Sequence, residues 1–229
     1  MNTFAEKLDP RAWVRYQDES LLVVDKPSGI LSIPHGYDSS LPYLGGLLEP
    51  YFGKIWMVHR LDKETSGLLV LARNIEAHRE LNREFREREV HKTYHCLVTP
   101  APDWDSLAMT EPLLVDADRE HRTRVDLIHG KPACTEARTL LRKDPFALLA
   151  CSISTGLRHQ IRAHLYFHGL HIPGDSLYAP RKLVEAESWK FSRMMLHSWR
   201  LKFTHPLTHE PMDFVAADPD EFLQVLMAD

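Results

Sequence analysis

The sequence has 229 residues, of which 44% are hydrophobic and 26% are charged, and its formal net charge is −4. These values are ordinary for a protein with a buried core, and they exclude wholesale disorder and collagen-like or coiled-coil structure. No apolar run approaches the roughly 18 residues that a membrane span needs. The polar start Met1–Lys7 also lacks the apolar stretch of a signal peptide. We therefore expect a cytoplasmic protein that does not bind a membrane.

The first half of the chain predicts two buried strands and a helix. Residues 20–24 form an apolar run that ends at the turn Asp25–Gly29, and residues 67–72 form a second apolar run. Asn74 is a typical helix N-cap, and the helix that it begins is expected to extend to about residue 88 with an apolar inner face.

The second half predicts five more strands and one more helix. The strands are expected over residues 90–98, 134–141, 146–153, 194–203 and 212–215. Apolar residues spaced by three or four predict a short amphipathic helix over residues 157–167. Arg158 and Arg162 would then lie together on its polar side. The irregular order of strands and helices predicts an α+β fold, in which helices flank a mixed, mainly antiparallel twisted sheet.

Polar residues are concentrated just before the second apolar strand, in the segment Val58–Gly67. Loops at the ends of rigid strands often hold catalytic groups. Asp62 has the chemistry of a nucleophile or a base, and Arg60 that of a phosphate or substrate ligand. The alternative is that Asp62 caps a turn and Arg60 is a surface charge.

A second polar segment, Ser154–His164, contains Thr155 and Gly156 directly before the predicted helix. A helix start favours anions because its first N–H groups lack partners within the helix. An arginine of this segment that faced Asp62 would form a bidentate pair and keep the carboxylate ionised. The alternative is a salt-bridged surface helix.

A third segment, His91–Tyr94, begins a predicted strand. Tyr94 can stack on a base or donate a hydrogen bond from its hydroxyl, although strand tyrosines often pack in a core.

Basic residues are unevenly distributed. Between Arg119 and Lys143 there are seven Lys or Arg residues and three Asp or Glu residues. This segment is either a basic face for a polyanion or an ordinary solvated surface.

Metal and cofactor motifs are weak in this sequence. His164 and His168 have the spacing of metal ligands on a helix, but they have no Glu between them and no convincing third ligand. The three cysteines are odd in number, far apart and without a CxxC pair. The glycine turns match neither a phosphate-binding loop nor a dinucleotide-binding motif. We expect no metal and no cofactor.

Several short motifs follow one another along the chain from about Tyr16 to Ala216. They are Val24–Gly29, His59–Asp62, Thr65–Gly67, Phe85–Arg88, Lys92–Tyr94, Thr155–Gly156, His159–Arg162, Gly174–Asp175, Leu196–His197 and Thr204–Pro206. Taken together and in this order, they resemble the RluA family of pseudouridine synthases.

The resemblance implies an isomerase with a central active-site cleft that converts uridine to pseudouridine in RNA. The N-glycosidic bond breaks, and the uracil turns and rejoins the ribose through carbon, without a metal or organic cofactor. By resemblance, Asp62 is the essential carboxylate, acting as a nucleophile at the ribose or as a base on its 2′ position. Arg162 corresponds to its ion-pair partner. Tyr94 corresponds to the tyrosine that stacks on the uracil and helps to remove its C5 proton.

The resemblance also implies residues that bind RNA, namely His59, Arg60, Lys92 and Arg158. Arg60 corresponds to the residue that fills the space left when the target uridine is flipped out of the RNA. Leu157 stands where relatives commonly have Arg, so either Arg158 takes over that phosphate contact or the contact is lost. The implied partner is a stem-loop of ribosomal or transfer RNA.

We expect residues 1–229 to form a single catalytic domain, because only about fifteen residues precede the resemblance, too few for a separate RNA-binding domain. The chain is expected to be monomeric, with no obligatory protein partner. Two alternatives are a non-catalytic RNA-binding module and a metal-dependent hydrolase that uses some of the fourteen histidines. A binding module would not need Asp62, and a chelator would inhibit only the hydrolase.

Overall fold

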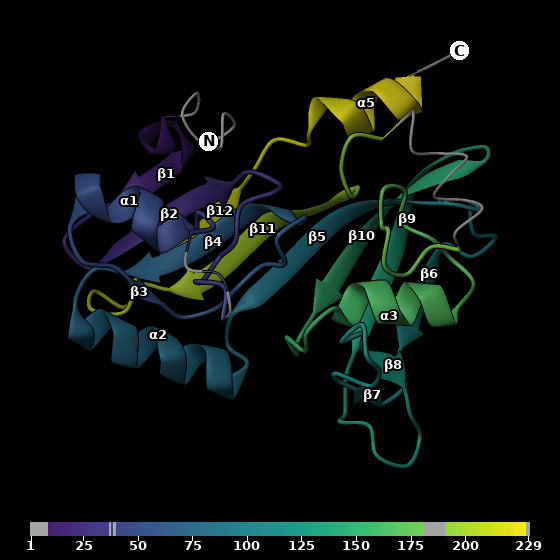
Figure 1. The fold of residues 1–229 in the computed structure, drawn as a ribbon, viewed down its shortest axis with the longest axis horizontal. Helices are drawn as coiled ribbons and strands as arrows, with labels where there is room; N and C mark the ends of the chain where they lie inside the picture. Colours follow the sequence, from purple (N-terminus) through teal and green to yellow (C-terminus); the bar gives the residue numbers. More distant parts are fainter. Residues whose placement is uncertain (1–8, 37, 39, 181–190, 228–229) are drawn as a thin grey trace. The chain divides into compact units, whose positions relative to one another are not determined.

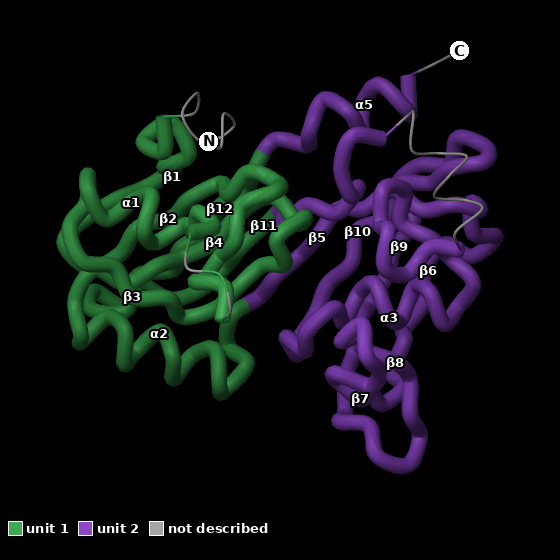
Figure 2. Tube along the Cα trace, in the orientation of Figure 1, with its two compact units in different colours: residues 1–90, 200–216 green, residues 91–199, 217–229 purple. Residues whose placement is uncertain are grey.

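The computed structural model describes residues 9–36, 38, 40–180 and 191–227 (Figure 1). The chain forms two compact units (Figure 2). Unit 1 contains residues 1–90 and 200–216, and unit 2 contains residues 91–199 and 217–229. The second boundary falls within strand β11 (Leu196–Thr204). Each unit has its own sheet segment and its own helices.

In unit 1, antiparallel strands pair in the order β1 (Val14–Gln17), β2 (Leu21–Lys26) and β4 (Ser66–Ala72). The short strand β3 (Trp56–Met57) also pairs with β4, and β12 (Pro211–Val215) pairs with the end of β11. The helices are a 3₁₀ turn η2 (Pro10–Trp13), α1 (Leu44–Phe52) and α2 (Ile75–Glu87).

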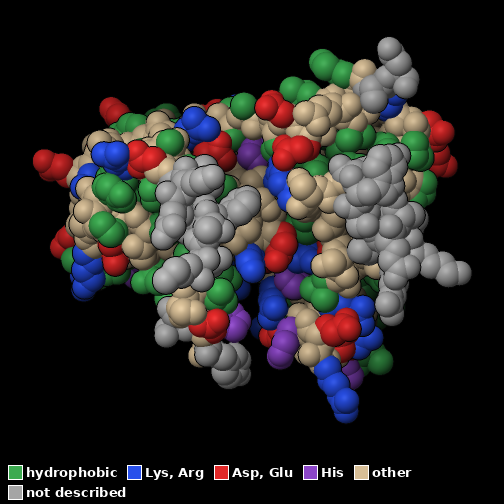
Figure 3. All heavy atoms as spheres, turned by 45° about the horizontal axis from the view of Figure 1, so that its top comes forward, with side chains coloured by type: hydrophobic (Ala, Val, Ile, Leu, Met, Phe, Trp, Pro, Cys, Tyr) green, Lys and Arg blue, Asp and Glu red, His purple; other side chains and the backbone are tan. Residues whose placement is uncertain are grey.

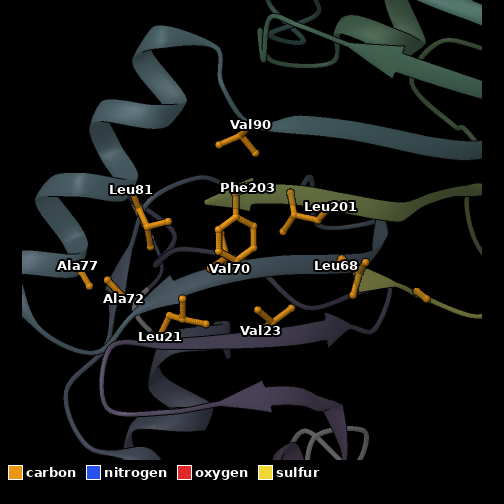
Figure 4. Close-up of a cluster of buried hydrophobic side chains, with 11 residues drawn as sticks. Leu21, Val23, Leu68, Val70, Ala72, Ala77, Leu81, Val90, Leu201 and Phe203 are labelled. Atoms are coloured by element: carbon orange, nitrogen blue, oxygen red, sulfur yellow. The ribbon is translucent and has the colours of Figure 1, made fainter. Parts of the chain in front are cut away.

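The core of unit 1 lies between the sheet and α2 (Figure 4). Every residue of β4 is buried, which explains its continuous apolar sequence. Leu81 of α2 contacts this core and is fully buried. The N-cap of α2 is Asn74, whose Oδ1 accepts a hydrogen bond from the Ala77 N–H at 2.8 Å. These contacts fix the sheet from which the Asp62 loop extends.

In unit 2, antiparallel strands pair in the order β5 (His91–Val98), β10 (Phe146–Ile153), β9 (Thr135–Lys143) and β6 (Ser106–Met109). A small second sheet joins β7 (Leu113–Leu114) to β8 (Arg124–Val125). Helix α3 (Gln160–Phe167) packs on β8 and β9, and α5 (Asp220–Met227) packs on β10. No described helix is long and apolar enough to cross a membrane.

The predicted fold class, an α+β fold with a mainly antiparallel sheet and flanking helices, is confirmed. The predicted strands and the first predicted helix agree with the structure to within two residues at each end. The predicted start of the second helix is wrong. It begins at Gln160 rather than at residue 157, because His159 has a φ of 54°, in the left-handed region that a right-handed helix cannot include. Helices α1 and α5 and several short strands were not predicted.

Candidate active site

Asp62 lies in unit 1, in the loop that leads into β4, and its side chain is partly exposed. Its neighbour Leu61 is buried and anchors the loop in the core. The Ser32 hydroxyl donates to the Leu61 carbonyl at 2.7 Å and accepts from the Leu61 N–H at 3.1 Å. The Thr65 N–H donates to the Asp62 carbonyl at 3.2 Å. The backbone on both sides of Asp62 is therefore fixed.

A fully buried lysine holds the same loop from a second segment. The Lys26 ammonium donates to the carbonyls of Pro27, Ile30 and Lys63 at 2.9, 2.8 and 3.2 Å. The Lys63 carbonyl also accepts from the Gly29 N–H at 2.8 Å. The motif Val24–Gly29 thus has a physical role, since it fixes the chain one residue after Asp62. Lysine is rarely fully buried without such partners.

His59 and Arg60 precede Asp62 in this loop. The His59 Nε2 accepts a hydrogen bond from the Val70 N–H at 3.1 Å. Its ring stacks on Phe85 of α2, with ring centroids 4.5 Å apart. These contacts give His59 a structural role that the sequence did not indicate, and its RNA contact stays a prediction. Arg60 is exposed, as a residue that enters RNA would be.

Tyr94 and Lys92 lie two residues apart on β5 in unit 2, so their side chains project from the same face of the strand. Tyr94 is buried, with 7% of its surface exposed. The Lys92 ammonium lies close to Gly156. A Cβ added to this glycine would be 3.3 Å from the Lys92 Nζ. Burial lowers the pKa of Lys92 to about 8, since it penalises the charged form.

The turn before α3 folds around the buried side chain of Gln160. Its amide nitrogen donates to the Cys134 carbonyl at 2.8 Å. Its amide oxygen accepts from the Thr155 hydroxyl at 2.8 Å and from the Leu157 N–H at 3.2 Å. The Leu157 N–H is thus bonded within the chain. Gln160 fixes the turn that leads to Arg162.

Arg162 forms a buried bidentate ion pair with Asp175. Its Nε lies 2.7 Å from Oδ2 and its Nη2 lies 2.8 Å from Oδ1. The two side chains are only 5% and 1% exposed. The sequence did not indicate this pair, although Asp175 follows Gly174 in one of the motifs. Asp62 and Arg162 belong to different units, and their pairing stays a prediction.

Arg158 lies before α3 and not on it, so the expectation that it shares one helix face with Arg162 is wrong. Its Nη1 pairs with Asp116 Oδ1 at 2.7 Å. Both side chains are more than one third exposed, and such a pair contributes little to stability. The guanidinium can therefore exchange this partner for an RNA phosphate at little cost, and that role stays a prediction.

The two histidines with metal-ligand spacing have other partners. His164 is buried, and its ring nitrogens contact the Thr135 hydroxyl at 2.8 Å and the Glu111 carbonyl at 3.0 Å. Burial lowers the pKa of His164, which favours the neutral ring. The His168 Nε2 lies 3.2 Å from Glu111 Oε1. Among the described residues, no three His, Cys, Asp or Glu side chains are grouped to hold a metal ion.

Comparisons with known proteins agree with these motifs. A family described as RNA pseudouridylate synthase matches residues 20–166. The dual-specificity RNA pseudouridine synthase RluA of Haemophilus influenzae is 37% identical over 215 residues, which cover 91% of this chain and 94% of that protein. The ribosomal large subunit pseudouridine synthase D of Nitrosomonas europaea is 33% identical over 94% of this chain, which spans 64% of that longer protein.

The fold also has solved relatives. The structure of human RNA pseudouridylate synthase domain containing 1 is similar with a TM-score of 0.77 and 25% sequence identity. The match covers 94% of each chain. A second human structure, RNA pseudouridylate synthase domain containing 4, has the same TM-score and identity.

Proposed function

Because the chain belongs to the RNA pseudouridylate synthase family, we propose that it is an isomerase that converts uridine to pseudouridine in structured RNA, with Asp62 as its essential carboxylate. The observation that carries this proposal is the way in which Asp62 is presented. The backbone on either side of it is fixed by the Lys26 ammonium at Lys63 and the Ser32 hydroxyl at Leu61, while Asp62 itself is partly exposed. A fixed backbone that bears an accessible carboxylate is the arrangement that a positioned nucleophile or base requires.

The proposed reaction breaks the bond between ribose C1′ and uracil N1 and forms a bond between C1′ and C5. The C5 proton leaves, and N1 gains a proton, so the product has the same atoms as the substrate. Asp62 takes part either as a nucleophile at the ribose or as a base on its 2′ position. Because the reaction is an isomerisation, it consumes no co-substrate.

Arg162 is proposed to pair with Asp62 and to keep it ionised, since a neighbouring guanidinium lowers the pKa of a carboxylate. A guanidinium has five N–H donors, so the bidentate pair with Asp175 is compatible with a second carboxylate. Tyr94 is proposed to stack on the uracil and to help remove its C5 proton. Its fixed place on the central part of β5 supports that role.

Arg60 is proposed to occupy the space of the flipped-out uridine, and His59, Lys92 and Arg158 to bind RNA around it. Exposed cations near β8 also support RNA binding. They are Arg119, Arg124 and Lys131. Figure 3 shows Lys and Arg (blue) and His (purple) side chains, mixed with acidic ones, at the lower right of the pictured face. The proposed substrate is a stem-loop of ribosomal or transfer RNA, modified in the cytoplasm by a monomer.

The test uses ribosomal RNA fragments and transfer RNAs transcribed with uridine that carries tritium at C5. Release of tritium to water measures the loss of the C5 hydrogen. We expect the wild-type protein to release tritium from at least one RNA and Asp62→Asn to release none. Asp105→Asn makes the same change at a side chain that is 91% exposed, and it should keep the wild-type rate. Equal release by wild type and Asp62→Asn would exclude Asp62 from the reaction. RNA binding without release by the wild type would instead indicate a binding module.

A further inference from the structure

The Arg162–Asp175 pair differs in its surroundings from another bidentate pair in the chain. Arg200 and Asp213 make the same two contacts, at 2.8 and 2.7 Å, but their side chains are 35% and 43% exposed. The Arg162–Asp175 pair is almost completely removed from solvent. Burying two charges carries a large desolvation cost, so a buried pair is weak evidence for a gain in stability. Because burial of the Arg162–Asp175 pair is costly, we expect this pair to have a role other than stabilising the fold.

We propose that Asp175 is a positioning residue, whose carboxylate fixes the Arg162 guanidinium in the orientation that the isomerisation needs. This inference rests on the proposed function of Arg162. Asp175 itself does not need to touch the substrate, because it acts through the guanidinium.

The orientation of the Asp175 carboxylate is set by its own turn. Its Oδ1 accepts from the N–H groups of Leu177 and Tyr178 at 3.0 and 3.2 Å. Gly174 has a φ of +76°, and a Cβ there would lie 2.0 Å from the Arg193 carbonyl oxygen. Only glycine fits that position, which explains the Gly–Asp sequence. The Asp175 carboxylate therefore has a fixed position, and the longer Arg162 side chain is held by its hydrogen bonds to that carboxylate.

A second contact holds the guanidinium over an aromatic ring. The Arg162 Cζ lies 4.9 Å from the centre of the Tyr178 ring. The Tyr178 hydroxyl accepts from the Thr123 N–H at 2.7 Å and contacts the His159 ring nitrogen at 3.1 Å. Burial raises the pKa of Tyr178 to about 12, so the hydroxyl stays protonated at neutral pH. The guanidinium is thus held by the Asp175 carboxylate and by the Tyr178 ring, which are themselves anchored.

The consequence for the reaction is preorganisation. An arginine has several rotatable bonds, and a free one would sample many orientations. A misplacement of about 1 Å can slow an enzyme by about 10²-fold. We therefore expect loss of the Asp175 contact to Arg162 to lower the rate of the chemical step and to leave RNA binding nearly unchanged.

The variant Asp175→Asn separates the two functions of the carboxylate. An amide oxygen at the Oδ1 position still accepts from Leu177 and Tyr178, whereas the amide nitrogen at the Oδ2 position opposes the Arg162 Nε–H. The matched control is Asp213→Asn, which makes the same change in the exposed pair. Single-turnover tritium release, RNA dissociation constants and melting midpoints are measured for both, at a temperature well below the lowest midpoint.

We expect Asp175→Asn to lower the single-turnover rate constant by about 10²-fold. Its RNA dissociation constant should stay within about twofold of the wild-type value, because binding lies outside the positioning role. Asp213→Asn should keep the wild-type rate. A wild-type rate constant for folded Asp175→Asn would overturn the inference, and so would a loss confined to RNA binding. If Asp175→Asn does not fold, Asp175→Glu keeps the charge and displaces it by one methylene. The single-turnover rate constant of Asp175→Glu is then compared with the wild-type value, and an unchanged rate constant would overturn the inference.

A double-mutant cycle separates this inference from the proposed function. Arg162→Lys keeps the positive charge but lacks the Nε–H that meets Oδ2. If Asp175 acts through Arg162, adding Asp175→Asn to Arg162→Lys should slow the reaction by no more than about threefold. Independent, multiplying losses would overturn the positioning role. If Arg162→Lys slows the reaction and Asp175→Asn does not, only this inference fails. If Arg162→Lys itself has the wild-type rate, the role proposed for Arg162 fails as well.

Discussion

The two units fix their functional residues by different means. In unit 1, the loop of Asp62 is held through its backbone, by the Lys26 ammonium and the Ser32 hydroxyl. In unit 2, Arg162 is held through its side chain, by the carboxylate of Asp175. The described supports of the Asp62 loop are backbone contacts, which a change of the Asp62 side chain leaves in place. The Arg162 side chain, in contrast, is itself one half of a buried ion pair. Function and stability should separate in the first region and remain coupled in the second.

The largest expected effect is that of Asp62→Asn on activity. Removing an essential general base or nucleophile typically costs at least about 10²–10⁴-fold in rate. Because the supports of the loop are backbone contacts, the free energy of unfolding and the RNA affinity should stay near their wild-type values. Tritium release under single-turnover conditions, with urea unfolding as the companion measurement, checks both. A destabilised Asp62→Asn protein would contradict the separation of function from stability in unit 1.

Arg162→Ala should lose activity and stability together. The change leaves the Asp175 carboxylate buried without its charge partner, and breaking such a pair costs about 3–5 kcal/mol of unfolding free energy. Urea unfolding measures this loss, and Arg200→Ala in the exposed pair is the control, with an expected cost of at most about 1 kcal/mol. Equal losses in the two variants would mean that burial makes no difference to the pair.

Lys26→Met should destabilise unit 1 because it leaves the carbonyls of Pro27, Ile30 and Lys63 without their charged donor. Each hydrogen bond to a charged group contributes about 1.5–3 kcal/mol, but burying the ammonium carries a desolvation cost that Met avoids, so we expect a total loss of about 3–5 kcal/mol. Lys143→Met, on the exposed end of β9, is the control and should be nearly neutral. If Lys26→Met unfolds like the control, Lys26 does not hold the loop.

The smallest effect concerns pH. The pKa of Lys92 is about 8 in the folded protein against an ordinary value of 10.5, because burial penalises its charge. Between these two values the unfolded chain keeps the Lys92 proton while the folded chain has lost it, so stability contributed by this residue rises with pH. The stability of wild type relative to Lys92→Met should increase by up to about 3 kcal/mol across that window. A constant difference from pH 7 to about pH 10 would contradict this account of Lys92.

The sequence predicted the elements whose signals are local. Asn74 caps α2 through its own side chain, and the apolar run of residues 67–72 is buried as β4 because both faces of this strand are covered. The candidate residues Asp62, Arg162 and Tyr94 came from motifs, which identify residue types but not their partners.

The remaining features depend on long-range or unusual local structure. Asp175 lies 13 residues after Arg162, and only the folded turn brings their side chains together. Lys26 has the sequence signature of an exposed turn residue. In the structure it is fully buried, and its ammonium donates hydrogen bonds to three carbonyls. The late start of α3 follows from the left-handed conformation of His159, which is not glycine and gives no signal in the sequence.

The most direct test of the central claim is pseudouridine mapping across total RNA from cells with and without the gene for this chain. The account predicts that at least one discrete site disappears with the gene, returns with the wild-type protein and does not return with Asp62→Asn. Full restoration of the site by Asp62→Asn would contradict the role of Asp62. A map that is identical with and without the gene would contradict the assignment of the chain as the pseudouridine synthase of these RNAs.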